Sequence, residues 1–258
     1  MDRKYKVPSP SEIIVLIGDN FIVEHLFHNF KRFSTLKTHK INSISELEKN
    51  VDYIIDCSFN EKSQNDVLQY SVENNIKKVV ILNHWKKFIN EFKDLVVVQA
   101  VVPDVYGEEH MSFSRPGAGN NYDMSISYCN MICESIRRMH EHKVGFIPNL
   151  YIDYGEESIK YLYVENLYEP IQYIIDNIDQ TSEYEIYDEY RNAGQILDTI
   201  KEVMEYKGTV TFNNTRTSYN KPIRKLPYQH NYKSLVNNIK GIYRHLVYNN
   251  ERFISDLF

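Results

Sequence analysis

The chain has 258 residues, of which 42% are hydrophobic and 25% charged, and its formal net charge is −5 with a pI near 6.0. Such a composition is typical of a globular protein with a sizeable core, and the mild negative charge predicts no nucleic-acid or membrane partner. No apolar run approaches membrane-spanning length. The three cysteines are an odd number, which favours reduced thiols and predicts a cytoplasmic protein.

The N-terminal stretch EIIVLIGDNFIVEHLF predicts a strand, a turn and a helix in succession. Ile13 to Ile17 is a continuous apolar run, as in strands that are buried on both faces. Gly18 interrupts the run, and Asp19 and Asn20 are residue types of turns and helix N-caps. From Phe21 onward apolar residues recur at helical spacing. This order is that of the first unit of a dinucleotide-binding α/β fold.

Further strands and helices follow in the alternation that is typical of a parallel sheet. Three apolar runs predict buried strands, at Val51 to Cys57, Ile76 to Leu82 and Leu95 to Val102. Phe33 to Ile41 is a weaker candidate for the second strand, and Glu61 to Asn75 predicts an amphipathic helix. We therefore expect a Rossmann-type, doubly wound parallel sheet in residues 1–150.

Residues 151–258 predict a smaller C-terminal α/β lobe. A turn-rich connector at 153–160 precedes a helical segment within Tyr161 to Asn177. A strand at Glu183 to Tyr187, a helix at Ala193 to Tyr206 and a strand at Thr209 to Phe212 are predicted next.

These stretches resemble the extended short-chain dehydrogenase/reductase superfamily, whose members include the NAD-dependent sugar epimerases and dehydratases. Gly18, the Phe21-Ile22 pair and Leu26 match its Thr-Gly-x-x-Gly-Phe-Ile-Gly-x-x-Leu pattern, although the turn is one residue shorter. The short segment between residues 42 and 50 makes the layout most similar to the dTDP-4-dehydrorhamnose reductase branch. Asn20 and Val23 stand where the second and third glycines of the pattern would be.

The resemblance implies a cofactor site for NAD or NADP, which the altered turn either keeps or has lost. Its expected residues are Gly18, Asp19, Asn20, Phe21, Ile22, Cys57 and Ser58. NAD-binding members carry an acidic residue at the end of the second strand, where this chain has Thr38, His39 and Lys40. Two interpretations of this basic end stay open, a contact for the 2′-phosphate of NADP and a solvated strand edge.

The catalytic motif of the superfamily is absent from the sequence. Its members use a Ser or Thr at the end of the strand before the active-site helix, and then a Tyr-x-x-x-Lys pair. In this chain the strand ends in Asn83 and His84, and no lysine has a tyrosine four residues before it. The candidates for a relocated acid or base are Asn83, His84, Tyr106 and Tyr122.

The resemblance also implies a cleft for a nucleotide sugar. Val105-Tyr106-Gly107 is similar to the Val-Tyr-Gly segment that lines the substrate pocket of the superfamily, and the basic loop 215–226 corresponds to its nucleotide-binding lobe. The expected substrate residues are Tyr106, Gly107, Arg216 and Arg224. No metal site is predicted, since Cys129 and Cys133 lie one helical turn apart without further ligands.

Three functions remain open at this stage. The first is a catalytically degenerate member of nucleotide-sugar metabolism, a pseudoenzyme with a binding, regulatory or partner role. The second is an active NAD(P)-dependent nucleotide-sugar reductase or epimerase with a relocated acid or base. The third is a non-enzymatic interaction protein on a Rossmann scaffold. A protein partner or a homodimer is compatible with each of them.

Overall fold

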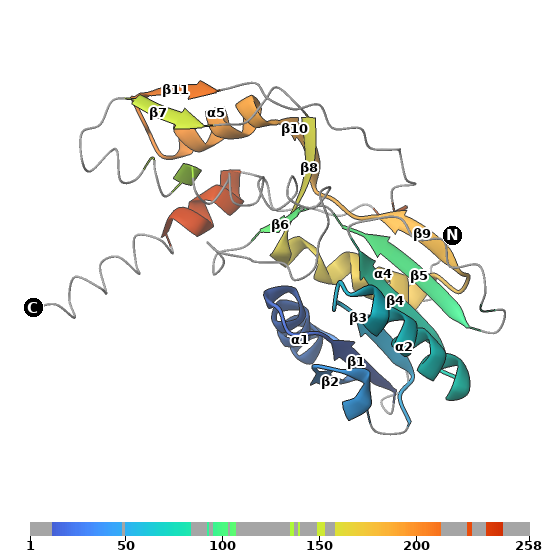
Figure 1. The fold of residues 1–258 in the computed structure, drawn as a ribbon. Helices are drawn as coiled ribbons and strands as arrows, with labels where there is room; N and C mark the ends of the chain where they lie inside the picture. The colour runs from blue at the N-terminus through green and yellow to red at the C-terminus, as the bar shows by residue number, and fades with distance from the viewer. Residues whose placement is uncertain are drawn as a thin grey trace, which may run out of the picture. The chain divides into compact units, whose positions relative to one another are not determined.

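The computed structural model describes residues 12–47, 50–83, 92, 95–102, 104–106, 135–136, 139, 149–152, 158–212, 226–228 and 236–244. The chain forms two compact units (Figure 1). Unit 1 comprises segments 1–103, 164–186 and 222–230, and unit 2 comprises 104–163, 187–221 and 231–258. The units are interleaved in sequence, in contrast to the single boundary at residue 150 that the sequence suggests, because residues 164–186 return to the sheet of unit 1.

Unit 1 is built on a six-stranded sheet in which every neighbouring pair of strands is parallel. The strand order is β2-β1-β3-β4-β5-β9. The strands are β1 (Ile13–Ile17), β2 (Lys37–Ile41), β3 (Tyr53–Asp56), β4 (Lys78–Asn83), β5 (Val96–Val101) and β9 (Ser182–Glu185). The Rossmann-type, doubly wound fold predicted from the sequence is thereby confirmed.

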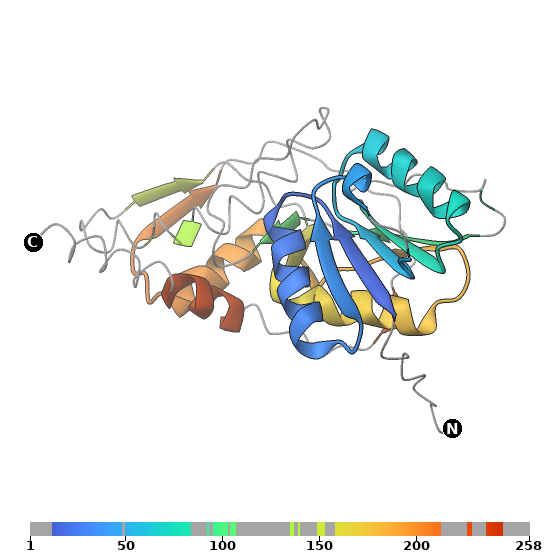
Figure 2. The same cartoon turned by 90° about the horizontal axis from the view of Figure 1, so that it is seen from below.

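Helices cover both faces of this sheet. Helix α2 (Glu61–Glu73) lies on one face, and α1 (Phe21–Phe33) and α4 (Tyr168–Asn177) lie on the other (Figure 2). Val67 and Leu68 of α2 form a core cluster with sheet residues such as Ile54. Each large aliphatic side chain buried in this way contributes about 1.5–3 kcal/mol, so the two-sided burial stabilises the parallel sheet.

Local capping explains where the first helices begin. Asn20 has an extended backbone, and its side chain accepts a hydrogen bond from the Val23 N–H, which starts α1. Asn60 does the same for α2 through the Ser63 N–H. A short 3-10 turn, η1 (Ile44–Glu46), lies between β2 and β3.

The second strand is shorter than predicted, because α1 continues through Phe33 and β2 begins only at Lys37. The ring of Phe30 packs edge-on against Tyr168 of α4 at 5.0 Å, and Phe33 lies 5.9 Å from the same ring. This contact between α1 and α4 favours Phe33 as the last residue of the helix rather than as part of the strand.

The described residues of unit 2 include two small sheets and helical segments, one of which is residues 236–244. Strands β6 (Asp104–Tyr106), β8 (Ser158–Tyr163) and β10 (Glu189–Asn192) form one sheet, and β7 (Asn149–Ile152) pairs with β11 (Thr209–Phe212). Helix α5 spans Ala193–Val203, and a second 3-10 turn, η2 (Val164–Asn166), begins the segment that re-enters unit 1. Strand β8 starts within the predicted connector, since its residues pair with both β6 and β10. None of the helices described is long and apolar enough to cross a membrane.

Candidate functional site

The candidate site of unit 1 lies where the carboxyl ends of β1, β3 and β4 meet. From β1 the chain first builds β2 on one side and then β3 on the other, so the strand order reverses between β1 and β3. In open parallel sheets a crevice forms outside the carboxyl ends of the strands at such a reversal, and ligands bind there. The β1–α1 turn and the end of β3 border this reversal, and they contain the predicted cofactor residues.

Gly18 makes the turn after β1 possible. Its φ of +141° lies in a region that residues with a side chain rarely adopt. A Cβ at this position would lie 2.9 Å from Cγ2 of Val23 and 3.0 Å from the carbonyl oxygen of Cys57. The Gly18 N–H donates to the carbonyl of Ile41 at 3.0 Å, which ties the turn to the end of β2. The glycine is thus required by the close packing of the turn itself.

Asn20 connects the turn to the neighbouring strand. Its Oδ1 accepts the Val23 N–H at 3.1 Å, and its Nδ2 donates to the carbonyl oxygen of Cys57 at 2.7 Å. The side chain therefore spans the reversal point between β1 and β3. Asp19 is exposed beside it, whereas the side chains of Phe21 and Ile22 are buried in the core.

The end of β3 carries a buried carboxyl group. Asp56 is 0% exposed, its Oδ1 accepts the Ser58 N–H at 2.7 Å, and its Oδ2 has no partner among the described residues. Burial raises the pKa of Asp56 to about 6, against the lowering effect of its hydrogen bonds with Ser58. Burial and the adjacent Asp56 also raise the pKa of the Cys57 thiol, which disfavours a reactive thiolate.

The end of β4 carries a buried amide. Asn83 is 1% exposed, and Nε2 of Gln64 on α2 donates to its Oδ1 at 2.5 Å. The Nδ2 of Asn83 has no hydrogen-bond partner within the described part of the chain. In the parallel register Asp56 is opposite Ile81, two residues before Asn83, so both polar side chains lie on the sheet face that α2 covers.

Of the predicted cofactor residues, Gly18, Asn20 and Cys57 come together at the reversal point, and Ser58 follows on the β3 end. Asp56 and Gln64 were not predicted as site residues. Asp56 lies near the end of the predicted strand Val51 to Cys57, so the sequence shows its place in the strand. Its burial depends on the strand register and on α2, which the sequence does not show.

The remaining predicted residues belong to unit 2, to β2 or to segments outside the described residues. Tyr106 ends β6 in unit 2, opposite Tyr163 of β8. His84, Gly107, Tyr122, Arg216 and Arg224 lie outside the described residues, as do Cys129 and Cys133. At the basic end of β2, Lys40 forms an ion pair with Glu24 of α1, and His39 is exposed. The pairing of Lys40 favours the solvated edge over a phosphate contact at that residue.

The β1–α1 turn does not fit a dinucleotide pyrophosphate as it stands. In dinucleotide-binding folds the pyrophosphate accepts hydrogen bonds from N–H groups at the helix N-terminus and approaches a glycine backbone closely. Here the side chain of Asn20 already accepts the Val23 N–H of this helix N-terminus. No metal-ion cluster of three or more His, Cys, Asp or Glu side chains occurs among the residues that the structure describes.

No protein-family model matches the chain, and no curated protein matches it in sequence. Solved structures do match its fold. The GDP-L-fucose synthetase of Naegleria fowleri bound to NADP aligns over 95% of both chains with a TM-score of 0.66 and 12% identity. The GDP-mannoheptose C4 reductase of Campylobacter jejuni with NADP bound aligns over 93% of this chain and 99% of its own, with a TM-score of 0.66 and 14% identity.

A third match is the UDP-N-acetylglucosamine 4-epimerase of Methanobrevibacter ruminantium in complex with UDP-N-acetylmuramic acid. It aligns over 93% of this chain and 99% of its own, with a TM-score of 0.63 and 13% identity. At these identities the likeness concerns the fold alone. The chain has the Rossmann-like α/β fold that these three enzymes share.

Proposed function

We propose that this chain is a catalytically degenerate protein with the nucleotide-sugar reductase and epimerase fold, which binds a nucleotide sugar in a regulatory or partner role. The observation that carries the proposal is the amide at the end of β4. Where the resemblance implies a hydroxyl that holds the substrate, the chain has Asn83, which is buried and held by Gln64. An amide donates and accepts hydrogen bonds but exchanges no proton near neutral pH, so it does not replace an acid or a base.

Two further features of the sequence support a loss of catalytic activity. The sequence contains no Tyr-x-x-x-Lys. Asn20 and Val23 occupy two glycine positions of the cofactor pattern. The ligand class rests on analogy with proteins of the same fold, which act on GDP-linked and UDP-linked sugars.

The test combines calorimetric titration with a turnover assay. Purified full-length protein is titrated with GDP-, UDP- and dTDP-linked sugars, with the corresponding nucleoside diphosphates as controls for the sugar. We expect one nucleotide-sugar class to bind with a Kd below about 1 mM and no hydride transfer from NADPH to a 4-keto sugar nucleotide. Absence of binding by every class would refute the ligand assignment, and measurable turnover would refute the degeneracy.

Asp56 favours one alternative, an active reductase or epimerase with a relocated acid. Its carboxyl has a pKa of about 6, stands at the carboxyl end of the sheet, and keeps one oxygen without a partner among the described residues. Such a group exchanges protons near neutral pH. If the turnover assay is positive, Asp56→Asn tests this assignment before the other candidates that can exchange a proton, His84, Tyr106 and Tyr122.

A further inference from the structure

We propose that the Asn20 side chain is a built-in substitute for the cofactor's pyrophosphate, so that the protein folds with its dinucleotide turn already closed and binds neither NAD nor NADP. The proposal concerns only the β1–α1 turn. It is independent of whether a nucleotide sugar binds.

The hydrogen bonds of Asn20 reproduce what a bound phosphate does at a helix N-terminus. Its Oδ1 accepts the Val23 N–H at 3.1 Å, which is a contact that a phosphate oxygen makes in dinucleotide-binding turns. The Asn20 carbonyl accepts the next N–H, that of Glu24, at 3.2 Å. The bond from Glu24 is the first regular bond of the helix, whereas the Val23 N–H has no carbonyl partner within the helix. A phosphate that bound this free donor would have to displace the Asn20 side chain.

The Nδ2 group of Asn20 bridges the reversal point of the sheet. Nδ2 of Asn20 donates to the carbonyl of Cys57 at 2.7 Å, across the reversal point between β1 and β3. A dinucleotide that crosses this point would need the space in which the amide lies. The space around Gly18 is filled as well, since its missing Cβ would lie 2.9 Å from Cγ2 of Val23.

The other asparagine cap shows that this bridge is not an ordinary feature of helix capping. Asn60 caps α2 with the same geometry, since its Oδ1 accepts the Ser63 N–H at 3.1 Å. Asn60 is exposed, and in the described part of the chain its amide makes no bridge to a neighbouring strand. The two residues are therefore a matched pair that differs in the bridge to β3.

The experiment measures NADPH and NADH binding by calorimetry to the wild-type protein and to Asn20→Gly, Asn20→Gly/Val23→Ala and Asn60→Gly. Glycine is well tolerated at an N-cap in place of asparagine. We expect no saturable binding by the wild type up to about 1 mM, and at least about ten-fold tighter binding by one of the two Asn20 variants. Asn60→Gly removes a cap without a bridge, so it should gain no binding and should lose less stability in urea than Asn20→Gly.

Saturable binding of either dinucleotide to the wild type at or below about 1 mM would overturn the proposal. It would also be overturned if both Asn20 variants fold and neither binds, because the exclusion would then lie elsewhere. Asn20→Ser covers the case in which the glycine variants do not fold. Serine keeps a cap acceptor for the Val23 N–H but cannot reach the Cys57 carbonyl, so it too should bind more tightly than the wild type.

Discussion

Nε2 of Gln64 on α2 donates a 2.5 Å hydrogen bond to Oδ1 of Asn83 at the end of β4, and both residues are buried. Gln64→Leu would leave the Asn83 oxygen without this partner. Because an unsatisfied buried acceptor costs about 1–3 kcal/mol, we expect the free energy of unfolding to fall by about 2 kcal/mol in urea titrations.

Gln69 on the same helix provides the control for this prediction. Gln69 donates to Glu73 at 3.1 Å, but this pair is exposed. Gln69→Leu should change the free energy of unfolding by less than about 0.5 kcal/mol. Equal effects of Gln64→Leu and Gln69→Leu would show that the buried pair adds no stability.

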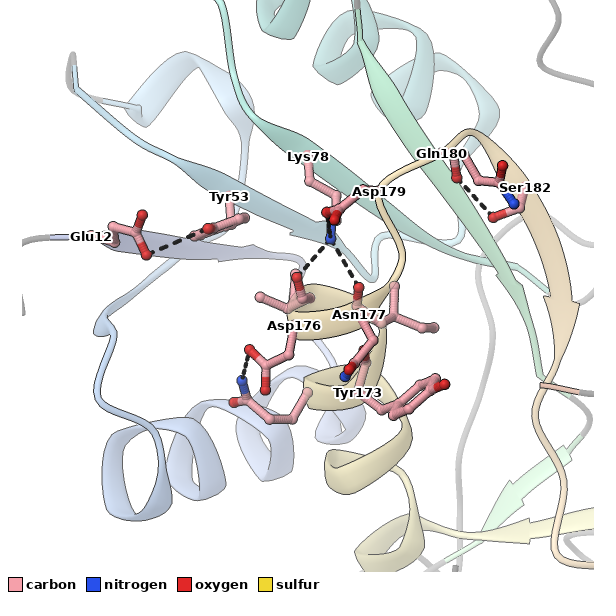
Figure 3. A network of polar contacts seen from close by, with 12 residues as sticks. Glu12, Tyr53, Lys78, Tyr173, Asp176, Asn177, Asp179, Gln180 and Ser182 are labelled. Carbon is pink, nitrogen blue, oxygen red and sulfur yellow. Dashed lines mark hydrogen bonds and ion pairs between the residues drawn. The ribbon is translucent and has the colours of Figure 1, made fainter. Parts of the chain in front are cut away.

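Lys78 of β4 caps the C-terminal end of α4 from inside the protein (Figure 3). Its Nζ donates to the carbonyl oxygens of Ile174 at 3.0 Å and Ile175 at 2.6 Å, and the residue is only 3% exposed. Lys78→Met keeps the buried stem but removes the donor from both carbonyls. We expect a loss of about 2 kcal/mol, because charged hydrogen bonds to a helix end outweigh the relief of an ammonium group from burial.

Asp179 separates this capping role from a surface ion pair. Its Oδ1 lies 3.4 Å from the same Nζ, but its side chain is 89% exposed. Asp179→Ala should therefore change the stability by less than about 0.5 kcal/mol. A larger effect of Asp179→Ala than of Lys78→Met in the same urea series would contradict the capping role.

Asp56 should make stability depend on pH in an unusual direction. Its pKa rises from 3.8 in the unfolded chain to about 6 in the fold, so the folded state binds the proton more tightly. Stability from this group is then fully present below about pH 4 and is lost as the pH rises through 6. The stability lost between these pH values is about 3 kcal/mol.

The measurement is the free energy of unfolding of Asp56→Asn relative to the wild type between pH 4 and 8. The free energy of unfolding of the variant should increase relative to that of the wild type as the pH rises through this range. The reason is that the variant carries no ionisable carboxyl at the buried position. Asp66→Asn on the exposed side of α2 controls for the loss of a surface carboxylate. A difference for Asp56→Asn that stays constant with pH would rule out the raised pKa.

Gly18→Ala should destabilise the protein by about 2–3 kcal/mol. The new Cβ would lie 3.0 Å from the main-chain carbonyl oxygen of Cys57, and the φ of +141° is strained for alanine. Shortening Val23 relieves only the side-chain contact, so Gly18→Ala/Val23→Ala should be less stable than Val23→Ala alone. Thermal unfolding of the three variants is the check, and equal midpoints for the last two would contradict the backbone argument.

Much of unit 1 could be predicted because its local sequence patterns agree with its tertiary packing. The run Ile13 to Ile17 is β1 without a change of bounds, and Asn20 caps α1 as its residue type predicts. The prediction was less accurate at the start of β2, where Phe33 belongs to the helix. Aromatic residues suit both states, and the contact with Tyr168, distant in sequence, decides between them.

The sequence by itself determined the apolar runs, the glycine turn, the caps and hence the parallel α/β fold, since these depend on residues that are close together in the chain. Only the tertiary structure decided which distant polar groups meet. Asn20 donates a hydrogen bond to Cys57, which is 37 residues away in the sequence, and Lys78 donates one to Ile174, which is 96 residues away. Strand register and helix placement set these partners, and no local periodicity encodes them.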